Sequence, residues 1–373
     1  MTKLFAPVKL GKDELAHRVV MAPLTRYRCD DDWVPLPIAK EYYSQRACIP
    51  GTLIISEATV ISLRHAGRRN VPGLWAPAQI AAWREITNVV HAQGCRIWCQ
   101  LWAQGRAGHA DVLEGVGSKL MSSSAIPLSG DGKPVPVEMT EDDIQGTIND
   151  YVTAARNAIE AGFDGVEVHG GNGYLPDQFL QDTCNKRTDG WGGTIEKRCR
   201  FHLALMEALV AAVGAERTAV RLSPWSDFLD MLMDDPLPTF THLVSELKKM
   251  KLGYLSLIEA RISGNDDTNV AKDKDVSFLV KLWDNISPVI LAGGFNTESA
   301  KDTVDVKYAD YDVAIAFGRY FVSNPDLVYR VQETIAMTKY DRAVFYTPKL
   351  AKGYVDWDFS PEFVAARTSR IVA

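Results

Sequence analysis

The chain alternates short apolar segments with longer amphipathic stretches. Eight apolar segments are each expected to form a β-strand: residues 18–24, 53–60, 96–102, 165–169, 219–223, 254–259, 288–292 and 312–317. Such alternation indicates a parallel sheet with crossover helices between consecutive strands. Because eight strands can close on themselves, the pattern predicts an α/β fold, a (β/α)₈ TIM barrel.

Two of the amphipathic stretches are expected to be helices with one buried side. Residues 77–93 carry apolar side chains at helical spacing on that side: Ile80, Trp83, Ile86, Val89 and Val90. Residues 140–161 begin with Thr140-Glu-Asp-Asp143, a capping box whose acidic residues lie at the positive end of the helix. Both stretches fit the crossover positions of a barrel.

Composition limits the classes of function. With 373 residues, 46% of them hydrophobic, the chain can bury a large core, and one barrel with insertions accounts for its length. Residues 1–373 are therefore expected to form a single domain. The net charge of −6 arises from mixed charges without a basic run, which argues against nucleic acid or an anionic membrane as partner. Chemistry on a small molecule is the better hypothesis.

The beginning of the chain and the cysteines indicate the compartment. The first residues contain no apolar signal region, and no segment has the apolar length of a membrane span, so a soluble cytoplasmic protein is expected. The six cysteines show neither the dense spacing of a disulfide scaffold nor a Cys-x-x-Cys pattern. Reduced thiols are expected, with no metal or iron–sulfur site.

The connection between the third and fourth expected strands is unusually long. It covers residues 103–139 and is rich in glycine, serine and proline. Long ordered loops are usually functional, and this one leaves the carboxyl end of a strand, where barrel active sites lie. We interpret it as a lid over the site; the alternative is a flexible surface insertion.

Polar side chains cluster directly after the fourth expected strand. Within residues 165–169, Glu167 and His169 share the strand face opposite the valines. Asn172 and Tyr174 follow among glycines, which allow a sharp turn, so these side chains can converge with His169. Each of them alone would more often be a turn or packing residue. Together they indicate a pocket that grips and protonates a substrate.

The last two expected strands end in groups suited to phosphate. Gly293 and Gly294 follow the seventh strand, and Gly318 and Arg319 follow the eighth. Glycines permit close backbone approach, helix amino termini present free N–H groups, and an arginine can bind two phosphate oxygens. A glycine pair is usually only a turn, and a single arginine a surface charge. Their combination at these two strand ends matches the usual phosphate site of such barrels.

Several motifs in this order resemble the old yellow enzyme family of flavin-dependent ene-reductases. They are His169-Gly-Gly-Asn172-Gly-Tyr174, Gln178-Phe-Leu180, Arg187-Thr-Asp-Gly-Trp-Gly-Gly193, Met21-Ala-Pro-Leu-Thr-Arg26, Pro72-Gly-Leu-Trp75, Gly318-Arg-Tyr-Phe321 and Phe345-Tyr346. The resemblance covers nearly the whole chain. It implies noncovalent FMN, with the phosphate held at Gly293, Gly294, Gly318 and Arg319, and NADPH rather than NADH as electron donor. The protein would be a monomer or homodimer.

The resemblance also implies which residues contact the flavin ring and the substrate. Arg221 would stabilise the N1–O2 edge of reduced flavin, Gln100 would bind O2 and N3, and Thr25 would donate to O4. On the residues alone, Arg221 would more often be a buried ion-pair partner, Gln100 a core amide and Thr25 a strand-end cap. The remaining expected cofactor contacts are Pro23, Leu24, Ala58 and Phe345, and the expected substrate contacts are Trp102, Phe228 and Tyr346, with His169, Asn172 and Tyr174. Threonine at position 25, where a separate branch has cysteine, places the chain with the classical branch.

The implied reaction is a ping-pong reduction of activated alkenes. Hydride would pass from NAD(P)H through FMN to the β-carbon of an α,β-unsaturated carbonyl or nitro compound. His169 and Asn172 would bind the oxygen on which charge develops, and Tyr174 would protonate the α-carbon. Alternatives are a biosynthetic flavin dehydrogenase or alkene isomerase of the same fold, and a non-catalytic flavin-binding barrel, which would require the loss of one of these three residues.

The chain departs from the family pattern at a few positions. Gly171 stands where alanine or serine is common, Trp191 and Trp225 replace tyrosine and phenylalanine, and Arg68 and Arg69 follow Gly67 where an aromatic residue is usual. Trp225 and Arg68 are expected at the mouth of the pocket. These departures put the substrate range in question, not the reaction.

Overall fold

Eight parallel strands form a closed barrel, as the sequence predicts. The computed structural model describes residues 2–260, 262–263, 266–267 and 274–372. In barrel order the strands are β3 (Val19–Met21), β4 (Leu53–Ile55), β6 (Arg96–Trp102), β9 (Gly165–His169), β10 (Thr218–Leu222), β11 (Tyr254–Ile258), β14 (Val289–Ala292) and β15 (Val313–Phe317). The pairing of β15 with β3 and of β4 with β6 closes the ring.

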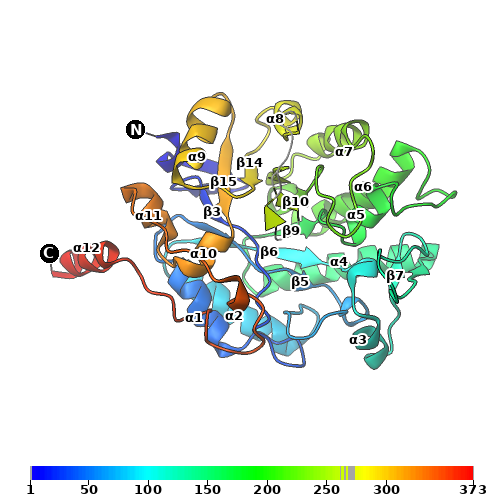
Figure 1. Ribbon diagram of the computed structural model, residues 1–373, viewed down its shortest axis with the longest axis horizontal. Helices are drawn as coiled ribbons and strands as arrows, with labels where there is room; N and C mark the ends of the chain where they lie inside the picture. The colour runs from blue at the N-terminus through cyan, green and yellow to red at the C-terminus, as the bar shows by residue number, and fades with distance from the viewer. Residues whose placement is uncertain (1, 261, 264–265, 268–273, 373) are drawn as a thin grey trace.

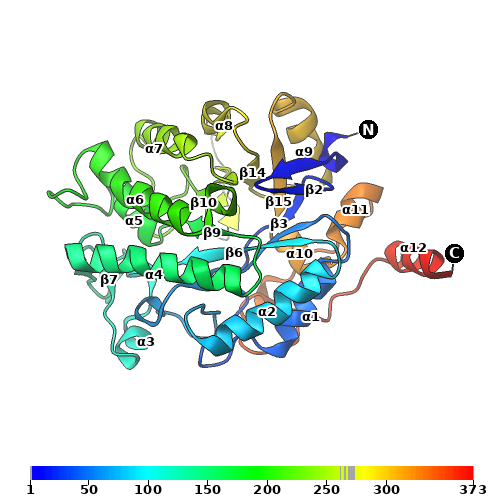
Figure 2. The same cartoon turned by 180° about the vertical axis from the view of Figure 1, so that it is seen from behind.

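Helices surround the strands on the outside (Figure 1) and are seen from behind in Figure 2. They are α1 (Pro37–Arg46), α2 (Pro77–His91), α4 (Glu141–Glu160), α5 (Leu175–Leu180), α6 (Ile195–Val213), α7 (Leu237–Lys249), α8 (Ser277–Trp283), α9 (Thr297–Asp302), α10 (Arg319–Ser323), α11 (Leu327–Glu333) and α12 (Pro361–Val372). The last of these extends away from the body of the molecule. None of the helices in the described ranges combines the length and apolar composition needed to cross a bilayer.

The two expected helices form with small shifts at their ends. Helix α2 ends at His91 instead of residue 93, and Ile80, Trp83 and Ile86 are buried as expected. Helix α4 has the expected capping box: the Thr140 hydroxyl accepts from the Asp143 N–H at 3.2 Å, and the Asp143 carboxylate accepts from the Thr140 N–H at 2.9 Å. The pairing satisfies amide groups that otherwise lack a partner at a helix start.

Two expected strands are shorter than the apolar pattern indicates. The first ends at Met21, so residues 22–26 leave the sheet. The second is interrupted after Ile55 and resumes as β5 (Thr59–Val60). At the interruption the buried Glu57 accepts a hydrogen bond from the Arg26 N–H at 3.1 Å. A buried carboxyl group is costly without a hydrogen-bond partner, and Glu57 finds this partner in the gap between β4 and β5.

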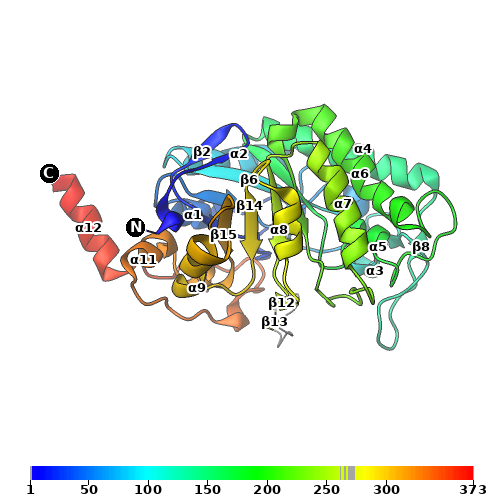
Figure 3. The same cartoon turned by 90° about the horizontal axis from the view of Figure 1, so that it is seen from above.

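A hairpin closes the amino end of the barrel and leaves the carboxyl end for the site. Strands β1 (Val8–Leu10) and β2 (Asp13–Leu15) place Leu10 and Leu15 against inward-facing core residues. In Figure 3 this hairpin lies at the top, and the arrow of β14 points toward the opposite end. Polar groups at the carboxyl end therefore face the part of the interior that is not filled by apolar side chains.

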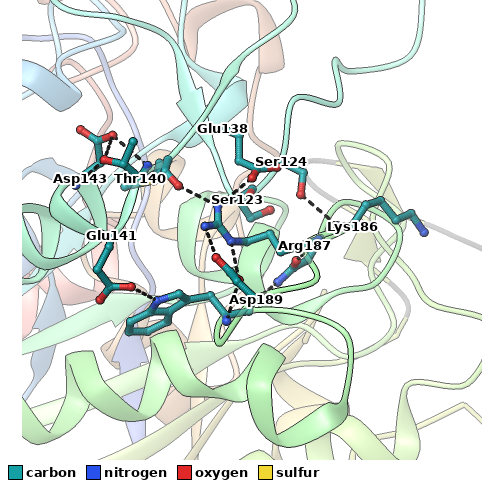
Figure 4. A network of polar contacts seen from close by, with 12 residues as sticks. Ser123, Ser124, Glu138, Thr140, Glu141, Asp143, Lys186, Arg187 and Asp189 are labelled. Atoms are coloured by element: carbon teal, nitrogen blue, oxygen red, sulfur yellow. Dashed lines mark hydrogen bonds and ion pairs between the residues drawn. The ribbon is translucent and has the colours of Figure 1, made fainter.

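The long connection 103–139 contains its own elements. Helix α3 (Ala110–Gly115) lies within it, and β7 (Met121–Ser122) pairs with β8 (Val137–Glu138). Arg187 joins the ends of these two strands. It donates to the carbonyl of Ser123, directly after β7, at 2.9 Å and to that of Met139, directly after β8, at 2.7 Å (Figure 4). These bonds anchor the connection at its base. Closure of the connection as a lid over the site stays a prediction.

The same anchor includes the motif 185–193. The Asp189 carboxylate accepts from Arg187 at 2.6 Å, and the Trp191 indole donates to the carboxylate of Glu141 at the start of α4 (Figure 4). Trp191, one of the unusual residues of this chain, thus joins the motif to the helix that follows the connection.

Candidate active site

A cavity of about 690 Å³ opens at the carboxyl end of the barrel. All the residues expected to be catalytic or to contact the cofactor or the substrate line it: Pro23, Leu24, Thr25, Ala58, Gln100, Trp102, His169, Asn172, Tyr174, Arg221, Phe228, Gly293, Gly294, Gly318, Arg319, Phe345 and Tyr346. The structure therefore brings the whole predicted set into one place. The role of each residue stays a prediction.

Strand register builds the polar floor of the cavity. Gln100 of β6 pairs with Glu167 of β9, and His169 of β9 pairs with Arg221 of β10, all on the inward face. The Gln100 amide donates to the Glu167 carboxylate at 2.7 Å, and the Tyr254 hydroxyl donates to its other oxygen at 2.9 Å. Because Glu167 fixes the amide, Gln100 presents its remaining polar atoms in one orientation.

Arg221 is a buried cation with unused donors. Its Nε and Nη1 atoms have no hydrogen-bond partner among the described residues. Burial lowers the pKa of Arg221, and the charge of Glu167 opposes this shift. Unpaired buried donors are costly, so their presence at the wall of a cavity indicates that a ligand supplies the acceptors.

The residues expected at the phosphate, namely Gly293, Gly294, Gly318 and Arg319, line another part of the cavity. Gly293 and Gly294 have φ of 155° and 65°. A Cβ atom at Gly293 would lie 2.6 Å from Cβ of Glu259, so any side chain there would be excluded. Gly318 directly precedes α10, and the Arg319 guanidinium lies 5.2 Å from the ring centre of Tyr340. Tyr340 also lines the cavity, although no sequence motif marked it.

The expected catalytic residues form one wall. The ring centre of Tyr174 lies 4.6 Å from that of His169 and 5.1 Å from that of Trp102, both edge to face. Asn172 has a left-handed φ of 55°, and its N–H donates to the Ser223 hydroxyl at 2.7 Å. The sharp turn expected from the glycines is therefore present.

Asp177 also holds this turn. The Gly173 N–H donates to the buried Asp177 carboxylate at 2.8 Å. A Cβ atom at Gly171 would lie 2.6 Å from the Ser223 hydroxyl oxygen, so a larger residue at this position would require Ser223 to shift. The turn that carries the expected catalytic side chains is thus held by backbone contacts on both sides of Asn172.

The protonation states of His169 and Tyr174 suit two tasks. With Asn172, His169 could act as an oxygen clamp, a pair of N–H donors to one substrate oxygen, and Tyr174 could donate a proton. Burial, reinforced by the Arg221 charge, holds the pKa of His169 well below its usual value, so the imidazole is neutral at neutral pH and offers one N–H. Burial raises the pKa of Tyr174 to about 12, and the Arg68 charge partly opposes this effect. The phenol therefore keeps its proton. Nδ1 of His169 and Oδ1 of Asn172 lack partners within the described chain.

Two buried arginines hold the segment around Phe345 at the cavity. Arg26 and Arg28 both donate to the Phe345 carbonyl, at 3.2 and 3.0 Å, and Arg28 also donates to the Thr347 hydroxyl at 2.6 Å. These bonds bring Phe345 and Tyr346 beside the first strand. The sequence motif gave the residues but not the arginines that position them.

Tyr27 and Trp225 are where the sequence analysis fell short. Tyr27 lines the cavity with a left-handed φ of 58°, which is rare for an aromatic residue and has no sequence signal. Trp225, expected at the mouth, is not among the lining residues; its indole donates to the Asp275 carbonyl at 2.8 Å, and its ring packs against Phe278. A hydrogen bond and a packing partner on neighbouring elements turn it away. Arg68 does line the cavity as expected.

These features fit FMN. The unpaired donors of Arg221 and the oriented amide of Gln100 would hold the electron-rich edge of the ring, and the glycine cradle with Arg319 would hold the phosphate. Within the described residues no cluster of three potential metal-binding side chains occurs.

Comparison with known proteins gives the family. Residues 3–338 match the model of the NADH:flavin oxidoreductase / NADH oxidase family. The chain is 54% identical to an NADP-dependent oxidoreductase, lnbE, of Aspergillus flavus over 98% of both chains. It is 53% identical to the chanoclavine-I aldehyde reductase fgaOx3 of Penicillium roqueforti over 98% of this chain and 99% of the relative. The crystal structure of old yellow enzyme from Pichia sp. AKU4542 superposes with a TM-score of 0.89 at 38% identity, covering 96% of this chain and 94% of the other.

The family predicted from the motifs is thereby confirmed. With its closed barrel and a cavity that fits the flavin, the chain belongs to the NADH:flavin oxidoreductase / NADH oxidase family, that of old yellow enzyme, and is an FMN-dependent oxidoreductase.

Proposed function

We propose that the protein is an ene-reductase that reduces the C=C bond of α,β-unsaturated aldehydes, ketones or nitro compounds. The observation that carries the proposal is the wall formed by His169, Asn172 and Tyr174. It combines a neutral imidazole, an amide whose N–H₂ group can donate, and a phenol that keeps its proton. Besides hydride, reduction of an activated alkene needs stabilisation of a developing oxyanion, assigned to His169 and Asn172, and delivery of a proton, assigned to Tyr174.

His169 and Asn172 bind and orient the substrate oxygen. Their N–H groups donate to the carbonyl or nitro oxygen, and donors that are already in place cost no reorganisation when charge develops there. Because His169 is neutral, it donates without giving up its proton. The turn held by Ser223 and Asp177 keeps Asn172 in its left-handed conformation for this purpose.

Tyr174 donates the proton to the α-carbon. Its edge-to-face contacts with His169 and Trp102 fix the plane of the ring. The raised pKa keeps the phenol protonated over the whole physiological range, and the nearby Arg68 charge stabilises the phenolate left after transfer. Solvent then returns the proton to the tyrosine.

FMN, when bound, supplies the hydride chemistry that links a nicotinamide donor to the alkene. Arg221 and Gln100 would hold its ring edge, Thr25 would contact the ring, and Gly293, Gly294, Gly318 and Arg319 would hold its phosphate. Pro23, Leu24, Ala58 and Phe345 complete the cofactor walls. We infer NADPH as donor, in line with the name of the Aspergillus relative. Donor and alkene use the same cavity in turn, with Trp102, Phe228 and Tyr346 around them.

The reactions of biosynthetic dehydrogenases and isomerases remain the alternatives to be separated by experiment. The holoenzyme is reduced anaerobically with one equivalent of NADPH and mixed with a panel of enals, enones and nitroalkenes. We expect flavin absorbance to return and the saturated product to form in equal amount. A flavin that stays reduced with every alkene, or an alkene that rearranges without consuming NADPH, would overturn the proposal.

A further inference from the structure

A second pocket of about 340 Å³ adjoins the cavity. Tyr27, Arg68 and Tyr346 line both, so the two spaces share one boundary. Beyond it the side pocket is lined by Arg69, Asn70, His109, Asp111, Val112 and Pro348. The Arg68 side chain can therefore be reached from either space, including by the far end of a ligand whose other end lies at the reaction wall.

Arg68 is held at this boundary with spare hydrogen-bonding capacity. Its Nη1 donates to the Tyr27 hydroxyl at 3.2 Å and its Nη2 to the Ala107 carbonyl at 3.3 Å. Its Nε is buried and has no partner in the ranges that the structure describes. The Trp33 indole fixes the backbone by donating to the Arg68 carbonyl at 2.7 Å. A guanidinium carries five N–H groups, so these contacts leave donors for an anion.

The other charged groups around the side pocket leave Arg68 available. Arg69 and Asp111 are exposed at the rim, with opposite charges. Burial, and after it the Arg68 charge, lowers the pKa of His109, which is neutral at neutral pH. The nearby Asp31 carboxylate accepts from Lys349 at 2.7 Å and from Asn70 at 3.1 Å. The acids near the pocket are thus solvated or already paired, and the arginine between the two spaces is partly buried.

We propose that the side pocket is an oxyanion-binding subsite in which Arg68 binds a carboxylate or phosphate at the far end of the molecule that occupies the reaction cavity. The proposal rests on the ene-reductase function and names a substrate class for it. Two sources share this chemistry: an alkene whose remote end carries a carboxylate, and the 2′-phosphate of NADPH. A planar guanidinium suits either, because it can present two parallel N–H groups.

The test uses the FMN-loaded protein and direct binding. Oxidised wild type, Arg68→Gln, Arg68→Lys and the rim control Arg69→Gln are titrated by calorimetry, without electron donor. The probes are α,β-unsaturated aldehydes of increasing chain length that end in a carboxylate, each with its methyl ester. Flavin content and thermal unfolding report whether a variant folds. The dissociation constants of NADPH and NADH are measured in parallel from the rate of anaerobic flavin reduction.

A hydrogen bond to a charged group is typically worth about ten- to a hundredfold in affinity. If the anion comes from the alkene, wild type prefers an acid of suitable length over its ester by that factor, Arg68→Gln loses the preference, Arg68→Lys restores part of it, and Arg69→Gln retains it. If the anion is the 2′-phosphate, the same pattern separates NADPH from NADH instead. Either result supports the subsite.

Equal affinity of wild type for acid and ester at every length, together with equal affinity for NADPH and NADH, would overturn the subsite. So would a preference that Arg68→Gln retains while it folds and binds flavin normally. Failure of the proposed function looks different: acids would bind more tightly than esters, yet no alkene would reoxidise the reduced flavin.

Discussion

The two ends of the barrel interior share the same strands but differ in chemistry. At the amino end, Leu10 of the hairpin packs with inward residues such as Ala219 and Trp98, all at most 1% exposed. Two positions further along the same strands, Arg221 and Gln100 carry polar atoms to the cavity. Two residues along a strand return the side chain to the same face, so this distance separates the apolar core from the polar cavity. Changes at one end should therefore affect stability, and changes at the other end should affect chemistry.

The largest effect should come from the proton donor at the reactive end. Tyr174→Phe removes the only group to which we assign protonation, and loss of general acid catalysis typically slows a reaction about 10²–10⁴-fold. Stopped-flow oxidation of the reduced flavin by an enone should slow by that order. Reduction by NADPH should stay nearly unchanged. Nitroalkenes serve as the control, because their nitronate product is stable enough to be protonated by solvent. An unchanged enone rate would contradict the assignment.

Removing the oxygen clamp should come next. Substitution of both His169 and Asn172 by Ala takes away the donors for the substrate oxygen, and loss of one such donor typically costs about 10²–10³-fold in rate. Carbonyl ligands and phenols should bind more weakly to the oxidised enzyme in absorbance titrations, while FMN should stay bound, because the residues to which we assign the cofactor are unchanged. Tight phenol binding by this double variant would place the clamp elsewhere.

A change at the amino end should lower stability without touching activity. Leu10→Ala leaves a cavity in the apolar cluster that closes the amino end of the barrel. Buried leucine-to-alanine changes cost about 2–5 kcal/mol in the free energy of unfolding. Denaturant unfolding should record this loss. The rates of both half-reactions, measured well below the unfolding midpoint, should equal those of wild type. A matching loss of rate would mean that the two ends are coupled.

The smallest expected effect is a pH dependence from the amino end. Burial lowers the pKa of His17 to about 4, and its Nδ1 accepts from the Val19 N–H at 3.2 Å. Below pH 6.5 the unfolded chain takes up a proton that folded His17 refuses until about pH 4, so stability falls as pH falls through this window. Between pH 7 and 5 this one group should cost about 2 kcal/mol.

His17→Gln should remove that part of the slope. Urea unfolding at pH 7 and at pH 5 gives the comparison, with the difference between the two pH values as the measured quantity. A variant that loses as much stability as wild type on acidification would show that His17 does not titrate as described.

The barrel was predictable because its signal is local and repeated. Each strand is a short apolar segment, and chemical groups at strand ends such as His169 and Arg319 follow it directly in the sequence. The strand ends themselves were less predictable, because Glu57 interrupts β4 to reach Arg26, a partner far away in the sequence. No pattern along the chain reports such a contact.

Residues positioned by distant partners were missed for the same reason. The Tyr27 carbonyl accepts a hydrogen bond from the Lys349 N–H at 2.9 Å, and Tyr340 packs against Phe345, whose carbonyl accepts from Arg26 and Arg28. Trp225 was placed wrongly because its hydrogen bond to Asp275 comes from a different crossover. Sequence reasoning worked where strand parity fixes the direction of a side chain, and it failed where a tertiary contact does.

The position of the transferred hydride tests the central claim most directly. Enzyme reduced with NADPH that carries deuterium at the transferable position is mixed anaerobically with an α,β-unsaturated aldehyde in ordinary water, and the product is analysed by NMR. The account predicts a saturated aldehyde with deuterium on the β-carbon and hydrogen from Tyr174 on the α-carbon. Deuterium on the carbonyl carbon, with the C=C bond intact, would mean that the site reduces the aldehyde itself and would contradict the account.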